Sequence, residues 1–179
     1  MIYLKRYNES SEETTNFNSF LSNLDELKEI CDGQLASLYD EGFELDYHIG
    51  RLTFPKDGLM KSVSPSLHVQ LVKKENWEMY SYTWKEVKDS FIPLLQLLSR
   101  RYVIYPSFDP RSDRLKMRQE DRIKVMLSTQ VSFYIGNGNS HSAARGTEHK
   151  YFSLKDVLDD KVSLGKRIFS ISIEIGGEL

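Results

Sequence analysis

The stretch Thr83-Trp-Lys-Glu86 opens a helix, and Ser99-Arg-Arg-Tyr102-Val-Ile-Tyr105 leads out of it into an apolar strand. Thr83 and Glu86 have the spacing of a capping box, in which each side chain binds the other residue's backbone N–H. Apolar residues three and four positions apart predict that one face of the helix at 84–101 is buried. The positions expected on that face are Val87, Phe91, Leu94, Leu95 and Leu98.

The same order of elements occurs earlier in the chain. Leu35-Ala-Ser-Leu-Tyr-Asp-Glu-Gly42 ends a helix and leads directly into Phe43-Glu-Leu-Asp-Tyr-His-Ile49. Gly42 predicts the helix end, because glycine enters the left-handed backbone region without a side-chain clash. The segment 43–49 alternates apolar and polar residues, which predicts a strand with one buried face. The apolar stripe of the preceding helix consists of Phe20, Leu24, Leu27, Cys31, Leu35 and Leu38.

Further strands are expected between the two helices. Residues 67–71 alternate in the same way, and 77–82 is expected to return beside them as a hairpin arm. Gly50 predicts a turn after the first strand, and 56–65 reads as a loop.

The C-terminal part has a different character. Residues 123–135 alternate over an unusual length, which favours a bent strand or one shared between two neighbours. Residues 136–150 are rich in Gly, Asn, Ser and His and are expected to form a loop, and 153–156 begins a short helix. A final strand is predicted from the alternating residues Phe169, Ile171, Ile173 and Ile175.

With a short strand at 2–5, these elements follow the order βαββαβ. That is the order of the ferredoxin-like sandwich. We therefore predict an α+β fold, namely a ferredoxin-like (βαββαβ) sandwich with an added hairpin arm and a C-terminal β-rich extension. Residues 1–107 are expected to form the ferredoxin-like core and 108–179 the extension, packed on that core as a single compact unit.

Composition excludes several classes of protein. The formal charge of −2 disfavours a nucleic-acid or anionic-membrane binder, since these usually carry a basic excess. The single cysteine, Cys31, rules out an intrachain disulfide and a cysteine-rich zinc site, and no cofactor is predicted. No stretch approaches the roughly 20 apolar residues that span a bilayer, and the N-terminus lacks the pattern of a signal peptide.

One set of polar side chains invites a chemical interpretation. If the strands at 43–49 and 66–72 are antiparallel neighbours, imidazoles and carboxylates share one face and are able to bind a metal or transfer protons. The simpler interpretation is that this face meets water or another chain. No tight ligand spacing favours a metal, and none is predicted. The residues concerned are Glu44, Asp46, His48, His68 and Gln70.

The loop at 136–150 resembles a phosphate cradle only in its glycine content. A Walker loop needs lysine and then serine or threonine after its second glycine, but Thr and Glu follow Gly146. A partner-contacting loop is the simpler interpretation. The alternative is a site assembled by this loop over a cleft, from Ser140, His141, Arg145 and His149.

Positive charge gathers at the start of the C-terminal extension, and it makes phosphate contact an alternative there. Acidic residues interleave with the basic ones and cancel most of their field, so solvated ion pairs are the simpler interpretation and nucleic acid is not the expected partner. The candidate phosphate contacts are Arg111, Arg114, Lys116 and Arg118.

The hairpin arm is rich in aromatic residues. Trp77, Tyr80 and Tyr82 lie close together in it, and aromatic side chains on an edge strand are typical of protein-binding surfaces. We therefore predict that these three residues contact a partner protein. Cys31, by contrast, lies on the apolar stripe of its helix and is expected to be an inert core thiol.

The first residues carry a resemblance. Met1-Ile-Tyr-Leu-Lys-Arg-Tyr-Asn-Glu-Ser10, followed by an acidic linker and a helix ending Leu-Tyr-Asp-Glu-Gly-Phe, resembles the start of many small proteins of large tailed bacteriophages. The resemblance covers about the first 45 residues and implies a phage origin, so we expect a protein of the virion or the host cytoplasm. It also implies that the N-terminal segment serves as an assembly tag, and it identifies no site residues.

The sequence therefore favours a non-enzymatic structural or accessory virion protein of a tailed bacteriophage that acts through protein–protein contacts, with virion components or with itself. No recognised catalytic motif points to an enzyme. Two alternatives remain open: a small phage hydrolase or nuclease with a site built from His and acidic residues, and a host-directed inhibitor protein.

Overall fold

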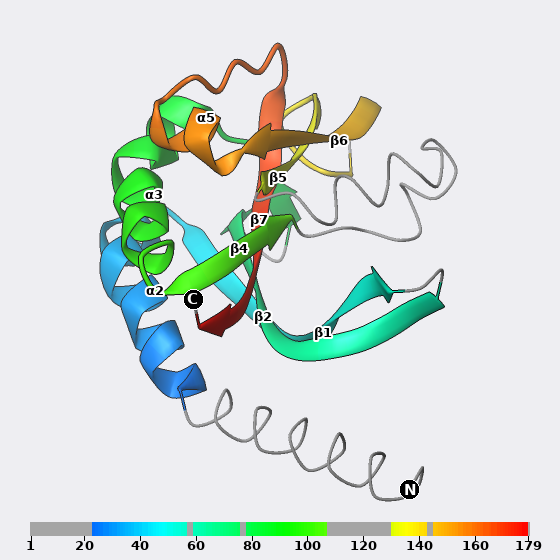
Figure 1. Cartoon of the computed structure of the whole chain (residues 1–179). Helices are drawn as coiled ribbons and strands as arrows, with labels where there is room; N and C mark the ends of the chain where they lie inside the picture. The colour runs from blue at the N-terminus through cyan, green and yellow to red at the C-terminus, as the bar shows by residue number, and fades with distance from the viewer. Residues whose placement is uncertain (1–22, 57–58, 76–77, 107–129, 143–144, 179) are drawn as a thin grey trace, which may run out of the picture.

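A computed structural model describes residues 23–56, 59–75, 78–106, 130–142 and 145–178. Within these ranges seven strands form one sheet, and the helices pack together against one of its faces (Figure 1). This arrangement confirms the α+β class. No helix in the described ranges is long and apolar enough to cross a membrane.

The strands pair antiparallel throughout. The main path of the sheet runs in the order β1 (Phe43–Lys56), β2 (Leu59–Glu75), β7 (Arg167–Glu178), β5 (Gln130–Asn137) and β6 (Arg145–Ser153). Two short strands lie off this path, β3 (Glu78–Tyr80) beside β2 and β4 (Tyr102–Pro106) beside β7. The pairing of β3 with the end of β2 is the expected hairpin arm.

The last strand, β7, lies in the middle of the sheet. One of its edges pairs with β2, while its other edge pairs first with β5 and then with β4. Strands from both sides of the predicted boundary at residue 107 thus belong to the same sheet. In a ferredoxin-like sheet the first strand lies where β7 lies here, between the third and fourth strands. Residues 2–5, predicted to be that strand, are outside the described ranges, so the named topology is not confirmed.

Two helices cover the sheet, and their ends follow the sequence signals. α2 (Leu24–Tyr39) is followed by Gly42, whose φ of +81° is the left-handed conformation expected after a helix. α3 (Trp84–Leu98) begins where the Glu86 carboxylate accepts bonds from the backbone N–H and the hydroxyl of Thr83, at 2.6 and 2.8 Å. A short third helix, α5 (Leu154–Leu158), begins with Ser153 Oγ accepting from the Asp156 N–H at 3.0 Å.

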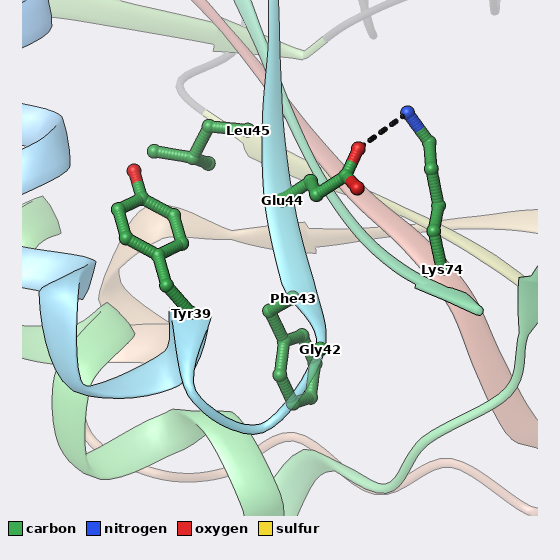
Figure 2. A pocket seen from close by; sticks show the side chains of 6 residues that line it. All are labelled: Tyr39, Gly42, Phe43, Glu44, Leu45 and Lys74. Atoms are coloured by element: carbon green, nitrogen blue, oxygen red, sulfur yellow. Dashed lines mark ion pairs between the residues drawn. The ribbon is translucent and has the colours of Figure 1, made fainter. Parts of the chain in front are cut away.

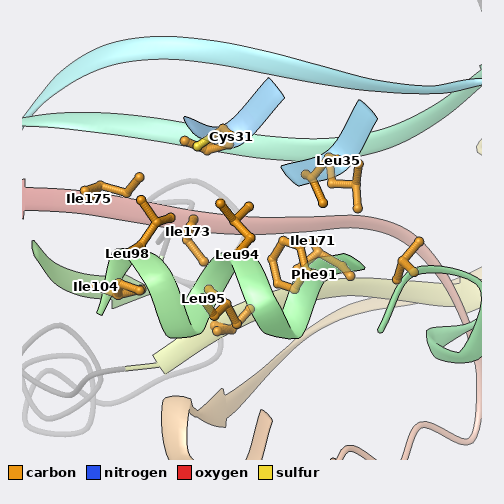
Figure 3. Packing of buried hydrophobic residues seen from close by; sticks show 14 of the residues in the cluster. Cys31, Leu35, Phe91, Leu94, Leu95, Leu98, Ile104, Ile171, Ile173 and Ile175 are labelled. Atoms are coloured by element: carbon orange, nitrogen blue, oxygen red, sulfur yellow. The ribbon is translucent and has the colours of Figure 1, made fainter. Parts of the chain in front are cut away.

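The apolar core lies between these helices and the sheet. Leu94 and Leu98 of α3 face Ile171, Ile173 and Ile175 of β7 (Figure 3). Burial of these side chains is the main source of stability, at about 25 cal/mol for each Å² of apolar surface removed from water. The stripe of α2 is confirmed over the described residues, with buried Leu24, Leu27, Cys31, Leu35 and Leu38.

Two predicted loops are strands instead. β1 continues through Gly50 to Lys56 and pairs with β2 from its first residue, Leu59, so the turn predicted at Gly50 is wrong. Glycine fits an extended ladder when a neighbouring strand supplies backbone partners, and this long-range pairing outweighs the local turn signal. In the same way, the second half of the predicted loop at 136–150 belongs to β6, which begins at Arg145.

The final strand also departs from strict alternation. Its register with β5 shifts beside Tyr134, so Ile168 rather than Phe169 joins the core cluster. Such an irregularity moves the following side chain to the other face of the sheet. Ile171, Ile173 and Ile175 are buried in the core as predicted.

Candidate functional site

The sheet carries a second set of side chains, on the face away from the core. Because side chains alternate along a strand, the residues between core positions point to this other face. Val72 illustrates this: it is 1% exposed and yet lies outside the core cluster. We call this the serine–histidine face, made of Glu44, Asp46, His48, Ser66, His68, Gln70, Val72, Ser132, Tyr134, His149, Tyr151, Phe169, Ser170, Ser172 and Glu174, together with His141, whose ring lies beside those of Tyr134 and Phe169.

The predicted sharing of a face by β1 and β2 is confirmed. The register places His48 opposite His68, and Asp46 opposite Gln70. Lys74 joins this face at the edge, where its Nζ lies 3.0 Å from Glu44 and 3.1 Å from Asp46. Partial burial alone would lower the pKa of Lys74, but its bonds to these two carboxylates raise it.

A hydrogen-bonded cluster lies where β1, β2 and β7 meet. The His68 and His48 rings lie 5.9 Å apart between centroids, with an interplanar angle of 32°. His68 Nδ1 lies 3.2 Å from Glu174 Oε2, and the hydroxyl of Ser66 donates to the other oxygen of Glu174. The side chains of His68 and Glu174 are 20% and 16% exposed. The carboxylate therefore fixes the orientation of the His68 imidazole.

The middle of the face is made of uncharged residues. One register row runs from Gln70 through Ser172 and Ser132 to Tyr151. Ser132 and Ser172 are 1% and 8% exposed, so both serines of this row are buried. This row crosses four strands without a charged side chain, which is unusual for a sheet face that meets only water.

The far end of the face is an aromatic group centred on Tyr134. The ring of His149 lies 4.9 Å from it, that of His141 5.7 Å, and that of Phe169 6.1 Å. His149 also stacks on Tyr151, at 6.4 Å and 21°. His141 and His149, two residues of the alternative loop site, therefore lie beside the same phenol ring.

Ser140 and Arg145, the other two candidates from that segment, are not part of this group. Ser140 forms a bridge with Tyr80 of the hairpin arm, and exposed Arg145 pairs in the ladder with Asn137. The segment thus assembles no phosphate cradle from its described residues. The sequence analysis did not identify Tyr134 as the centre of this group. Tyr134 and His149 become neighbours only through the pairing of β5 with β6.

All four histidines of the chain lie on this one face. His48 and His68 are at one end, and His141 and His149 are at the other. The two pairs are far apart in the sequence, and the pairing of β1, β2, β7, β5 and β6 in one sheet places them on the same face.

The predicted aromatic contact surface on the hairpin arm needs correction. Tyr82 is 0% exposed, and its hydroxyl donates to the carbonyl of Leu71 at 2.9 Å. This side chain belongs to the core and does not reach a partner. Burial raises the pKa of Tyr82 well above its ordinary value. Tyr80 is half-buried, with its hydroxyl 3.5 Å from Glu78, and Trp77 lies outside the described residues.

The candidate phosphate contacts Arg111, Arg114, Lys116 and Arg118 also lie outside the described residues. Arg101, a basic residue ten positions before the first of them, has partners among the described residues. Its guanidinium lies 3.0 Å from Glu26 and stacks over Tyr102 at 5.4 Å.

Two shallow pockets lie near the start of β1. The first has a volume of about 440 Å³, and its lining divides into Tyr39 and Leu45 on one side of the strand and the Glu44–Lys74 ion pair on the other (Figure 2). The second, of about 420 Å³, includes Lys73, Lys74 and Arg167. Arg167 donates to the hydroxyl and carbonyl of Ser81 at 2.8 and 2.9 Å. These cations already have partners within the chain, so neither pocket presents an unpaired charge cluster for a substrate.

The described residues contain neither a three-ligand metal site nor a reactive thiol. Within them, no group of three or more His, Cys, Asp or Glu side chains is arranged to hold a metal ion. Cys31 is 0% exposed, and burial, with a smaller contribution from Asp32, raises the pKa of its thiol to about 12. It is a core side chain, as predicted, because the reactive thiolate is not formed near neutral pH.

Comparison of the chain with protein-family models, with curated proteins and with solved structures finds no match.

Proposed function

We propose that this chain is a non-enzymatic protein that acts through protein–protein contacts, and that the serine–histidine face is its contact surface. The carrying observation is the composition of that face: an uncharged row from Gln70 to Tyr151, next to an aromatic group around Tyr134. Tyrosine supplies a large contact area and loses little conformational entropy when it is fixed, and serine supplies adaptable hydrogen bonds. Surfaces rich in both residue types are therefore typical of binding sites. Lysine and glutamate, which interfaces avoid at their centres, are confined here to its ends.

The proposed partners are components of a tailed-phage particle, or a second copy of this chain. Two features support this: the resemblance of the N-terminal sequence to small phage proteins, and a sheet face with no described helix or strand packed on it. The protein would then reside in the virion or, before assembly, in the host cytoplasm.

The experiment that tests this proposal is the recovery of the chain from particles. Phage particles purified by density banding are analysed by mass spectrometry, and tagged full-length chain is used to capture its neighbours from infected cells. We expect the chain in the particles, or stable capture of particle proteins. A chain that stays monomeric at high concentration and captures no particle protein contradicts the proposal. Capture of host proteins alone favours the host-directed inhibitor instead.

A second function, a small hydrolase or nuclease, is favoured by one observation. Glu174 orients the imidazole of His68, and His48 lies next to it. A carboxylate-oriented imidazole is a common general base. Hydrolysis of ester or phosphodiester reporter substrates by the native chain, lost in folded His68→Ala and His48→Ala variants, would support this function. Inactivity of the native chain on both substrate types would argue against it.

The ferredoxin-like arrangement also remains a proposal. Its support is the order β1, β2, β7, β4, antiparallel at every step, with the helices on one face. In this arrangement β7 occupies the place in the sheet, between β2 and β4, that the sequence analysis expected residues 2–5 to fill.

A further inference from the structure

We infer that His48 and His68 form a binding site for a divalent transition-metal ion, of the Zn²⁺, Ni²⁺ or Cu²⁺ type, with Glu174 as the carboxylate that supports it. This inference goes beyond the contact function proposed above and does not depend on it. Three features carry it: the register of two strands, one oriented ring, and the exposure of the site.

The register brings the two rings to a suitable separation. His48 and His68 are direct partners across β1 and β2, and their ring centroids lie 5.9 Å apart. With metal–nitrogen bonds of about 2.0 to 2.1 Å, two imidazoles on one tetrahedral ion have centroids on the order of 5 Å apart. The observed separation of the two rings is therefore close to the one that a shared ion requires.

The second feature is the hydrogen bonding behind His68. A metal-binding imidazole usually donates its other N–H to a carboxylate, which fixes the tautomer and strengthens the ligand. Glu174 Oε2 lies 3.2 Å from Nδ1 of His68, and Ser66 binds the other oxygen of the same carboxylate. This arrangement assigns Nε2 of His68 to the metal. Ser66 is 0% exposed, so the support is held within the sheet.

The third feature is access and ligand type. His48 is exposed and His68 is half-buried, so an ion can reach both rings from solvent. Imidazole nitrogens suit Zn²⁺, Cu²⁺ and Ni²⁺ rather than Mg²⁺ or Ca²⁺, which prefer oxygen ligands. Two protein ligands leave the remaining positions to water, which fits the finding that no three-ligand group exists among the described residues.

Two measurements on the full chain test this inference. Calorimetric titration with Zn²⁺ alone measures binding of that ion, and electron paramagnetic resonance of the chain with Cu²⁺ identifies the ligands of the copper ion. We expect saturable binding of one ion and a nitrogen-coupled copper signal. His48→Ala and His68→Ala should each abolish both. Glu174→Gln should weaken binding about 10- to 100-fold, since it alters only the supporting hydrogen bond.

The matched control is the double variant His141→Ala/His149→Ala, which removes the other two histidines of the same face. It should bind Zn²⁺ like the native chain. Circular dichroism and thermal melting of each variant separate loss of the site from loss of the fold. The inference is overturned if the folded native chain shows no saturable binding, if folded His48→Ala and His68→Ala variants bind unchanged, or if the control variant loses binding equally.

Discussion

On one side of the sheet, α2, α3 and α5 pack leucine, isoleucine and phenylalanine into a continuous core; on the other, the same strands present serine, histidine and tyrosine. The first side is explained by folding alone, because burying apolar surface stabilises the chain wherever it occurs. Folding alone does not explain the composition of the second side. Its buried hydroxyls contribute little to a core, and its histidines come from distant parts of the sequence. This difference between the two sides is the basis of our proposal that the serine–histidine face is a contact surface.

The largest predicted effect lies on the core side. Leu94→Ala should destabilise the protein by about 2 to 5 kcal/mol, because it removes a fully buried side chain and leaves a cavity between α3 and β7. Leu97→Ala on the same helix is the matched control. Leu97 is 39% exposed, so its loss should change stability by no more than about 0.5 kcal/mol. Urea unfolding of both variants measures the difference, and equal losses would contradict the assigned faces of α3.

A smaller effect is predicted at the hairpin arm. Tyr82→Phe removes the donor to the Leu71 carbonyl and should cost about 1 kcal/mol in urea unfolding. Tyr80→Phe, two residues away on the arm, should cost less than about 0.5 kcal/mol, because its hydroxyl makes only a long contact with Glu78. If Tyr80→Phe were the costlier change, the assignment of Tyr82 to the core would be wrong.

A third prediction concerns the cap of α3 and its dependence on pH. Partial burial alone would raise the pKa of Glu86, but bonds from the Thr83 N–H and hydroxyl, and from Lys73, lower it overall. A lowered carboxyl pKa contributes stability that is present above the unfolded value of about 4.3 and lost as the pH falls through the folded value.

Glu86→Gln should therefore destabilise the protein at pH 7 by up to about 1 kcal/mol, as loss of a cap does. The gap between native and variant should narrow as the pH falls below about 4.3. Thermal melts of both proteins from pH 7 to pH 3 measure this gap. A gap that is constant over the whole range would mean that the Glu86 charge has no part in the cap.

The core side of this comparison was largely predictable from sequence. The α2 and α3 stripes and the strands at 43–49 and 67–71 follow local periodicity, so each could be read within a short window. Gly50 misled the prediction because a glycine's turn preference is local, whereas its place in β1 depends on pairing with a strand beyond it.

The serine–histidine face was predictable only where two neighbouring strands form a hairpin. His48 and His68 could be assigned together, since antiparallel pairing of adjacent strands follows from the chain order. Glu174, by contrast, is 106 residues from His68 and reaches it only because β7 enters the middle of the sheet. Tyr82 was placed on the surface because an aromatic side chain in a short arm carries no signal of burial.

The most direct test of the central claim is a pair of identical charge substitutions on the two sides of the molecule. Gln70→Arg places a long cation in the uncharged row of the serine–histidine face, and Gln96→Arg places one on the exposed side of α3. Both tagged variants are used for capture from infected cells, after melting curves confirm that they fold. The contact proposal predicts that Gln70→Arg loses the captured particle proteins while Gln96→Arg retains them. Full capture by folded Gln70→Arg, or equal loss in both variants, would contradict the assignment of this face.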